Sequence, residues 1–371
     1  MNILITGYNG FIGKNLSFFL ENKKNIKIFK FGKNNNLKDL ENYVKKCEIV
    51  FHLAGENRNK EQTQFINNNF KLTRDLVNLI KKKSKKTHLI FSSTKQIESK
   101  KNIYTQTKLD AENYLKKNVG KNLSVIIYRF TNIFGKWAKP NYNSVIATFS
   151  HRISRNKKIK ISRYNERIEF LYIDEVIKLF YDDIKNKKTR NLSLVKKFDN
   201  SYKIKLFDLV KKIKYFHKYR QKLISDAELA HGFDKLLYST FLTYIPVKQF
   251  KYNISSIKDK RGSFFEFVKS KNNGQISILV VKPNQVRGNH YHMTKVERFL
   301  ILSGQGYFVF KNLINGEQKK ILFNSTKETI VETIPGWAHN IKNTGKKDLI
   351  AILWANENYN KEKPDTIYYK V

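Results

Sequence analysis

Cysteine is almost absent from this sequence. Cys47 is the only one among 371 residues, which excludes an internal disulfide and any cluster of thiolate metal ligands. Runs of about 18 consecutive apolar residues, which a membrane-spanning helix needs, are also missing. The sequence opens directly on an apolar segment, with no basic leader before it. From these absences we expect a cytoplasmic protein with no membrane insertion.

Acidic residues are scarce as well. Asp and Glu number 31 against 72 Lys and Arg, which gives a formal net charge of +41. So large a charge would suit a nucleic-acid partner, because cations that pair with phosphates release counterions. The basic residues are spread along the whole chain, however, so we interpret them as a solvated surface and expect no nucleic-acid partner. Such a surface still attracts a diphosphate-bearing cofactor and substrate.

The sequence has enough apolar material for two cores. Hydrophobic residues make up 40% and aromatic residues 13%, which argues for a globular chain, and 371 residues exceed one ordinary domain. Strands alternate with helices in the first part, whereas short apolar runs separated by turns fill the last part. We predict an α/β domain with a Rossmann-type, doubly wound parallel sheet over residues 1–243. An all-β barrel is predicted over residues 244–371.

A glycine-rich turn follows the first apolar segment, residues 3–5, and leads into a helix predicted over residues 14–20. The order of strand, turn and helix lets backbone N–H groups and a helix N-terminus meet a pyrophosphate. A merely structural turn is the alternative, but the strand–helix alternation that follows favours cofactor binding. The predicted cofactor contacts of this turn are Gly7, Gly10, Phe11, Ile12 and Gly13.

The second strand, predicted over residues 26–31, indicates which dinucleotide binds. NAD-binding folds commonly place Asp or Glu at the end of this strand to hold the ribose 2′-hydroxyl, whereas a 2′-phosphate needs positive charge. Here the strand ends without an acidic residue, and Lys30 and Lys33 lie close by. We therefore predict that the cofactor is NADP(H).

Three further residues have the chemistry of carbonyl reduction. An apolar strand, residues 89–91, runs into Thr94, and Tyr104 and Lys108 follow with the i, i+4 spacing of one helix face. Thr94 would hold the carbonyl oxygen and Tyr104 would protonate it as hydride arrives. Lys108 would lower the pKa of Tyr104 and bind the nicotinamide ribose. His52, in the buried strand of residues 48–55, is interpreted as a packed residue.

On these motifs the first part, to about residue 240, resembles the extended short-chain dehydrogenase/reductase family, whose members process nucleotide sugars. The resemblance adds Asn69, expected at a helix start, as a cofactor contact, and makes Tyr104 and Lys108 cofactor contacts as well. Dehydratases of this family carry an acid directly after the threonine, whereas Lys95 and Gln96 follow Thr94 here. A reductase or a 4-epimerase therefore remains. The remaining motifs are Arg129-Phe130-x-Asn132-x-Phe134-Gly135 and Glu169-Phe170-Leu171-Tyr172-Ile173-Asp174-Glu175-Val176.

The last part carries a set of metal-ligand types. His290 and His292 are two apart on a predicted strand and so face the same side, Glu297 can return after a turn, and His339 can approach from a facing strand. Histidines on a metal-free barrel are the alternative. The spacing resembles that of the cupin family, with these four residues as ligands. Zinc suits three imidazoles and a carboxylate, although iron, manganese or nickel would also be accepted.

Over nearly its full length, and most distinctly in residues 135–149, 236–240, 259–267 and 288–295, the chain resembles a family of bacterial capsule-biosynthesis enzymes, UDP-2-acetamido-2,6-dideoxy-hexulose reductases. The resemblance implies two steps toward UDP-N-acetyl-L-fucosamine: epimerisation at C3 of a UDP-4-keto-6-deoxy amino sugar by the cupin, then reduction at C4 with NADPH. Lys295 and Tyr291 are candidates for proton transfer in the first step. Two alternatives are a reductase whose cupin only dimerises and a scaffold without turnover. By analogy with other cupins we expect a homodimer, paired through a strand edge.

Overall fold

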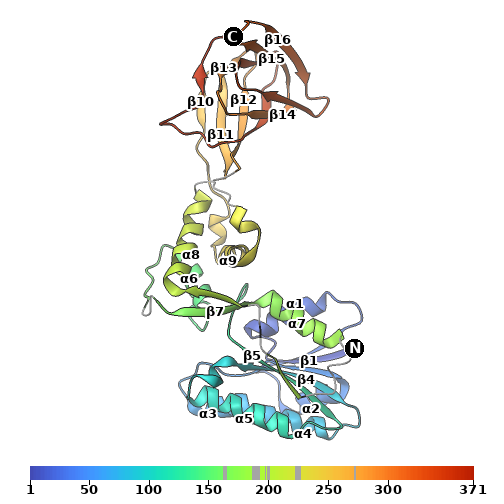
Figure 1. Cartoon of the computed structure of the whole chain (residues 1–371). Helices are drawn as coiled ribbons and strands as arrows, with labels where there is room; N and C mark the ends of the chain where they lie inside the picture. Colours follow the sequence, from blue (N-terminus) through green and yellow to red (C-terminus); the bar gives the residue numbers. More distant parts are fainter. Residues whose placement is uncertain (162–164, 186–192, 197, 199–200, 222–226, 271–272) are drawn as a thin grey trace. The chain divides into compact units, whose positions relative to one another are not determined.

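The computed structural model describes residues 1–161, 165–185, 193–196, 198, 201–221, 227–270 and 273–371 (Figure 1). The chain divides into two compact units. Met1–Lys214 and Leu236–Pro246 form the first, and Tyr215–Lys235 and Val247–Val371 form the second. The chain thus passes between the units more than once, and the boundary predicted between residues 243 and 244 lies near the last passage. No helix in the described part is long and apolar enough to cross a membrane.

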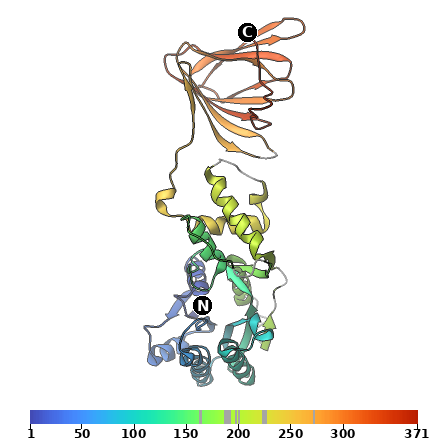
Figure 2. The same cartoon turned by 90° about the vertical axis from the view of Figure 1, so that its left-hand side faces the viewer.

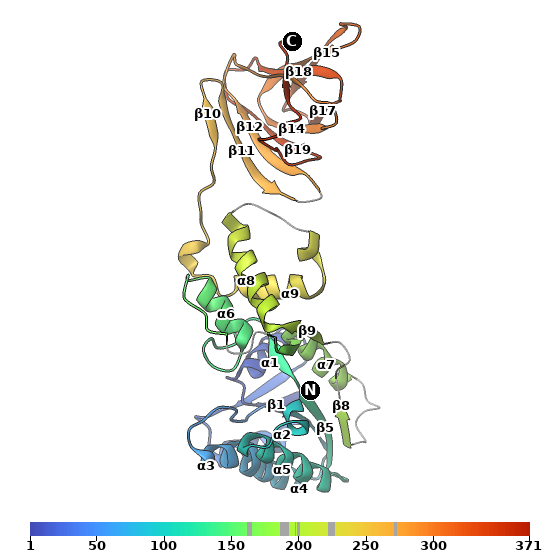
Figure 3. The ribbon, with the colours of Figure 1, turned by 60° about the vertical axis from the view of Figure 1, so that its left-hand side comes forward.

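A parallel six-stranded sheet forms the centre of the first unit, in the order β2-β1-β3-β4-β5-β8 (Figures 1 and 3). Consecutive strands run outward in opposite directions from the gap between β1 and β3, which is the switch point where such sheets bind ligands. This confirms the predicted doubly wound sheet. The strands are β1 (Asn2–Thr6), β2 (Lys27–Phe31), β3 (Ile49–His52), β4 (Thr87–Thr94), β5 (Leu123–Phe130) and β8 (Ser193–Lys196).

Helices cover both faces of this sheet. Apolar side chains of α1 (Phe11–Glu21) and α7 (Ile173–Lys185) pack on one face. Those of α2 (Leu37–Lys46), α4 (Leu72–Lys81) and α5 (Ile103–Lys117) pack on the other. The inner strands β1 and β3 are buried on both sides and are largely apolar for that reason, whereas the edge strand β2 exposes Lys27 and Lys30.

A smaller sheet, β6-β7-β9, follows the carboxyl end of β5. It comprises β6 (Asn132–Phe134), β7 (Arg167–Tyr172) and β9 (Tyr202–Lys205). The remaining helices are α3 (Gln62–Phe65), α6 (Val145–Ile153), α8 (Leu206–Gln221) and α9 (Gly232–Leu242).

The second unit contains two antiparallel sheets, β10-β11-β12-β19-β14-β17 and β16-β15-β18-β13-β20 (Figure 2). Buried side chains of both sheets form one core between them. The predicted all-β second part is therefore confirmed. Its strands are β10 (Ile257–Asp259), β11 (Gly262–Lys269), β12 (Gln275–Val281), β13 (Val286–Tyr291), β14 (Glu297–Ser303), β15 (Gln305–Asn312), β16 (Gln318–Asn324), β17 (Thr329–Thr333), β18 (Trp337–Asn343), β19 (Leu349–Ala355) and β20 (Ile367–Tyr368).

Candidate active site and metal centre

The glycine-rich turn lies at the switch point of the parallel sheet. Gly7 has φ +71°, and its N–H donates to the Phe31 carbonyl at 2.8 Å. A Cβ on Gly7 would stand 2.6 Å from the Ala54 nitrogen, and one on Gly13 would stand 2.2 Å from the Gly7 carbonyl oxygen. Only glycine fits at these two positions. Gly10 caps α1 without a side chain, so the first turn of α1 is open to a phosphate.

Phe11 and Ile12, the other predicted contacts of this turn, lie in the first turn of α1. Both are half-buried and pack against the apolar core of that face. Their side chains therefore support the turn, and their backbone N–H groups are the atoms placed to meet a phosphate.

The two lysines near the end of β2 differ in their partners. The Lys30 ammonium lies 2.5 Å from Glu21 Oε1 and is thus engaged within the protein. Lys33 is exposed in the loop after β2. Contact of either lysine with a 2′-phosphate stays a prediction, and Lys30 is the one already paired with Glu21.

Thr94, Tyr104 and Lys108 come together where β4 meets α5. Thr94 ends β4 and hydrogen-bonds the Tyr104 phenol. Burial raises the pKa of Tyr104, and the hydrogen bond with Thr94 lowers it by less. Tyr104 therefore rests as the neutral phenol, the form that can give a proton to a carbonyl oxygen.

Lys108 lies one helical turn after Tyr104 and is 4% exposed. Its ammonium donates to the Ser92 carbonyl at 2.9 Å and lies 4.7 Å from the centre of the Phe91 ring. Burial lowers the pKa of Lys108 to about 8, although the carboxylate of Glu112 opposes the change. A Cβ on Gly55 would stand 3.0 Å from the Lys108 nitrogen, so the loop after β3 closes over this lysine.

Asn69 does not begin a helix, contrary to the sequence-based expectation. It lies inside a π-helical segment, Ile66–Lys71, that joins α3 to α4. A π-helix adds one residue to the turn and thereby changes the direction of its side chains, which is why such segments recur at functional sites. Here the fully buried Asn69 amide accepts from the Glu56 N–H at 2.8 Å and donates to Thr107 Oγ1 at 3.1 Å. Asn69 thus ties the loop after β3 to the helix that carries Tyr104 and Lys108.

His52 is more than a packed residue. The Thr73 hydroxyl donates to the Asn69 carbonyl at 2.7 Å, so it can only accept from His52 Nε2, which lies 2.8 Å away. His52 Nδ1 must then accept the Thr6 hydroxyl proton at 2.7 Å. Burial, assisted by the charge of Lys108, lowers the pKa of His52 to about 3, so the ring stays neutral. The chain of bonds links the glycine-rich turn to Asn69.

A buried carboxylate anchors the end of β4. Glu112 of α5 accepts from Ser93 Oγ at 2.6 Å and from Arg129 at 2.7 Å. Burial would raise the pKa of Glu112, but these hydrogen bonds hold it below its ordinary value. The positions of Ser93 and Thr94 are thereby fixed against α5 and β5.

Lys95 stands where dehydratases carry their acid. Its ammonium pairs with Glu169 of β7 at 2.7 Å, and the Gln96 N–H donates to Thr94 Oγ1 at 3.2 Å. The position that holds a carboxylic acid in dehydratases is thus taken by an ammonium that is paired with Glu169.

His290, His292, Glu297 and His339 form one cluster, whose potential ligand atoms all lie within 4.8 Å of one another. They come from β13, the residue after it, the start of β14, and β18. Glu297 Oε2 lies 3.2 Å from His292 Nε2 and 3.6 Å from His339 Nε2. The Nε2 atoms of all three histidines are buried without a hydrogen-bond partner among the described residues. Buried polar atoms are rarely left so, and this donor set fits a divalent metal.

Electrostatics favour the metal-binding forms of Glu297 and His339. Burial alone would raise the pKa of Glu297, but the nearby side chains of His290, His292 and His339 and the charge of Lys295 hold it well below its ordinary value. Burial is the main cause that lowers the pKa of His339. A carboxylate and neutral imidazoles are the protonation states that bind a metal.

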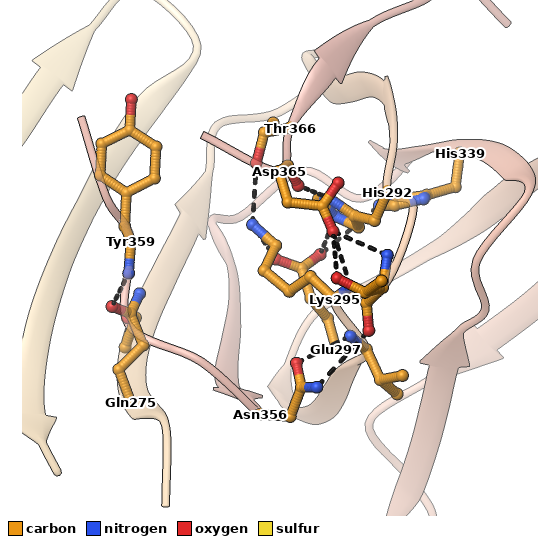
Figure 4. A network of polar contacts seen from close by, with 12 residues as sticks. Gln275, His292, Lys295, Glu297, His339, Asn356, Tyr359, Asp365 and Thr366 are labelled. Atoms are coloured by element: carbon orange, nitrogen blue, oxygen red, sulfur yellow. Dashed lines mark hydrogen bonds and ion pairs between the residues drawn. The ribbon is translucent and has the colours of Figure 1, made fainter. Parts of the chain in front are cut away.

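The segment after β19 returns to support this cluster (Figure 4). The Asp365 carbonyl accepts the Nδ1–H of His292 at 2.5 Å, which leaves Nε2 free for a metal. The Asp365 carboxylate accepts the N–H groups of Met293, Thr294 and Lys295 at 2.7, 2.7 and 2.8 Å. The loop between the histidines and Glu297 is thus held by a residue that sequence spacing gave no reason to select.

The two candidates for proton transfer differ in position. The Lys295 ammonium is 3.6 Å from Glu297 Oε1 and donates to Thr366 Oγ1 at 2.8 Å. Tyr291 lies between His290 and His292 on the strand and so faces the opposite side, where its ring is 6.3 Å from that of Tyr369. The structure brings Lys295 to the cluster and leaves Tyr291 outside it.

Comparisons with known proteins agree with both units. Residues 3–191 match the model of the NAD dependent epimerase/dehydratase family, and residues 257–367 match that of the polysaccharide biosynthesis C-terminal domain. The UDP-2-acetamido-2,6-beta-L-arabino-hexul-4-ose reductase of Pseudomonas aeruginosa is 36% identical over 368 residues, 99% of this chain and 98% of that protein.

Solved structures extend the likeness to the fold. The capsular polysaccharide assembling protein CapF from Staphylococcus aureus is 33% identical and covers 100% of both chains with a TM-score of 0.88. The UDP-glucuronic acid 4-epimerase from Bacillus cereus matches with a TM-score of 0.53 at 18% identity, over 59% of this chain and 83% of its own. This second likeness shows the fold alone.

Proposed function

This chain belongs to the NAD dependent epimerase/dehydratase family and, over its full length, to the UDP-2-acetamido-2,6-dideoxy-hexulose reductases. From that premise we propose that it reduces a 4-keto sugar. The substrate is a UDP-linked 4-keto-6-deoxy amino sugar, as the name of the Pseudomonas relative suggests. The observation that carries the proposal is the contact of the Tyr104 phenol with Thr94 beside the buried Lys108.

In this reaction the bound nicotinamide supplies hydride to C4. Thr94 and Tyr104 hold the carbonyl oxygen, and Tyr104 gives it a proton as the negative charge develops. Lys108, fixed on the Ser92 carbonyl, stabilises the phenolate that remains and binds the ribose of the cofactor. Asn69 keeps the loop after β3 and the helix of Tyr104 in register while the substrate is turned over.

NADPH is the proposed reductant. The residues at the end of β2, 30–33, include no Asp or Glu, and Lys33 is exposed there to meet a 2′-phosphate. Tyr104→Phe tests the reductase, with Tyr114→Phe as the control on the outer part of the same helix. NADPH oxidation with the 4-keto sugar should fall at least ~100-fold in Tyr104→Phe and little in the control. Equal rates in the two variants would refute the role of Tyr104.

We further propose that the second unit is a metal-dependent 3-epimerase of the cupin type. The observation in its favour is the set of buried, unpartnered Nε2 atoms around Glu297. His290, His292, Glu297 and His339 would hold zinc. When bound, the metal supplies Lewis-acid stabilisation of the enediolate that forms once the C3 proton leaves. Lys295, whose ammonium lies 3.6 Å from Glu297 Oε1, is the proposed proton carrier.

Solvent exchange separates this proposal from a reductase whose cupin only dimerises. The chain is incubated in D2O with the UDP-4-keto sugar and no NADPH, and deuterium at C3 is followed by NMR. Exchange should occur in the zinc-loaded chain and in Tyr104→Phe, and should vanish in His290→Ala. Exchange that persists in His290→Ala, or that never appears in the loaded chain, would leave the second unit without an epimerase role.

The two steps together give a precursor of a surface polysaccharide, UDP-N-acetyl-L-fucosamine, made in the cytoplasm. NMR of the product with NADPH present, read at C3 and C4, tests this assignment directly. An inverted C3 and a C4 hydroxyl are expected. A product with C3 unchanged would restrict the enzyme to reduction.

A homodimer is proposed as well, through a sheet face. Apolar residues that lie opposite one another on the neighbouring strands β11, β12, β19, β14 and β17 form a row on the outer side of the six-stranded sheet. The row consists of Phe265, Ile278, Ile352, Leu300 and Ile330. Ile330 is exposed and the other four side chains are half-buried, and contiguous apolar patches that reach the surface mark association sites. Sedimentation of Ile330→Lys should give a monomer where the unchanged chain gives a dimer, and two dimers would exclude this face.

A further inference from the structure

Arg287 is an arginine in the interior of the second unit. It lies on β13 opposite Ile341 of β18, a core residue that is 3% exposed, and residues opposite one another in an antiparallel pair face the same side. The Arg287 side chain is 12% exposed. His290 pairs with His339 after a bulge in the same strand and faces the same interior. Arg287, His290 and His339 therefore face the same side of this sheet.

The acidic neighbour of Arg287 is committed elsewhere. Asp259, at the end of β10, accepts the N–H of Arg261 at 2.8 Å and the Nη2–H of Arg261 at 2.7 Å. Arg287 Nη1 stands 3.6 Å from Asp259 Oδ1, beyond hydrogen-bond distance. This Nη1 is buried and has no hydrogen-bond partner in the part of the chain that the structure describes. Two guanidinium groups thus share one carboxylate, and a positive charge is left over.

A buried, charged donor without a partner is uncommon, because buried polar groups are nearly always hydrogen-bonded. Burial lowers the pKa of Arg287 by more than Asp259 raises it, yet a guanidinium stays protonated under any physiological condition. The fork of N–H groups in arginine matches two oxygens of a phosphate. The Nη1 group of Arg287 is thus suited to donate to a phosphate oxygen.

We propose that Arg287 binds the diphosphate of the nucleotide sugar whose ring lies at the His290 cluster, and so makes this site specific for nucleotide-linked sugars. The inference rests on the proposed epimerase function. At about 3.3 Å per residue, the backbone of Arg287 is roughly 10 Å or less from that of His290. The sugar ring and its anomeric oxygen separate the reacting carbon from the first phosphorus, so one molecule reaches both places.

The first test measures substrate affinity in the metal-loaded, full-length chain. Arg287→Met is compared with Lys319→Met, which removes an exposed cation that pairs with Glu317 in the same unit. In the C3 exchange assay, Arg287→Met should raise the KM of the UDP-sugar and the inhibition constant of UDP about 10- to 100-fold. The exchange rate at saturation and the metal content should change little, and Arg287→Lys should recover part of the affinity. If the KM of the UDP-sugar and the inhibition constant of UDP are unchanged in Arg287→Met, Arg287 does not bind the diphosphate and only contacts Asp259.

A second readout needs no turnover. With Mn²⁺ bound at the His290 cluster, UDP held beside it should show broadened ³¹P lines, and the broadening should be lost in Arg287→Met but kept in Lys319→Met. Equal broadening in both variants would overturn the proposal. If the unchanged chain shows no exchange at C3, the epimerase function fails. Broadening that depends on Arg287 would still establish the phosphate site.

Discussion

The buried charge of Lys108 should lower the free energy of unfolding, so replacement of this residue by methionine should stabilise the protein. The side chain is 4% exposed, and burial lowers its pKa from 10.5 to about 8. At about 1.4 kcal/mol per pKa unit, keeping this ammonium charged in the folded state costs about 3 kcal/mol. Loss of the bond to the Ser92 carbonyl would take back about 1 kcal/mol. Lys108→Met should therefore be about 2 kcal/mol more stable at neutral pH while its reductase activity is lost.

The prediction also fixes how the free energy of unfolding changes with pH. Between about pH 8 and pH 10.5 the unfolded chain holds a proton on Lys108 that the folded chain has released, so the free energy of unfolding rises with pH. Lys108→Met lacks that rise, and its advantage should shrink across this range. Urea unfolding at about pH 7 and about pH 9.5 measures the difference, with the exposed Lys117→Met as control. A variant that is less stable at pH 7, or an advantage that does not change with pH, would refute the argument.

Three further predictions follow from buried or engaged groups. The pKa of His52 is about 3 in the folded chain, so below pH 6.5 this residue takes up a proton only in the unfolded chain, and stability falls as the solution is acidified. Between about pH 6.5 and pH 4, urea unfolding should show that the unchanged chain loses about 3 kcal/mol more stability than His52→Asn. Stability curves that run parallel over this pH range would contradict the prediction. Asp365→Ala should weaken zinc binding about 10- to 100-fold in a chelator competition, whereas the exposed Asp348→Ala should not, and equal affinities would show that the 293–295 loop needs no anchor. In steady-state kinetics Lys33→Glu should raise the KM of NADPH about tenfold. Lys30→Glu should raise it by less, since Lys30 is already paired with Glu21. A larger effect of Lys30→Glu would exclude Lys33 as the phosphate contact.

The sequence predicted those parts of the site that local spacing controls. Gly7 and Gly13 follow a strand within a few residues, Tyr104 and Lys108 are one helical turn apart, and His290 and His292 are two residues apart at the end of a strand. Each pattern has a geometric meaning that does not depend on distant parts of the chain.

Other parts of the site arise from tertiary contacts and left no such pattern. His52 meets Thr6 across 46 residues of sequence, and Asp365 meets His292 across 73. The π-helical turn at Asn69 changes a hydrogen-bond pattern that apolar periodicity does not report. In the sequence Arg287 is one of many basic residues, and only its pairing with Ile341 of β18 shows that it faces the interior.

The support that Asp365 gives to His292 also has a consequence for the order of events during synthesis. All four proposed ligands have been made once residue 339 is in place, but the carbonyl that orients His292 and the strand β20 that pairs with β13 come later. A nascent chain that ends between these points carries every ligand and lacks the group that fixes one of them. We expect such a chain to capture metal poorly, so that loading follows the completion of the barrel and seldom precedes it.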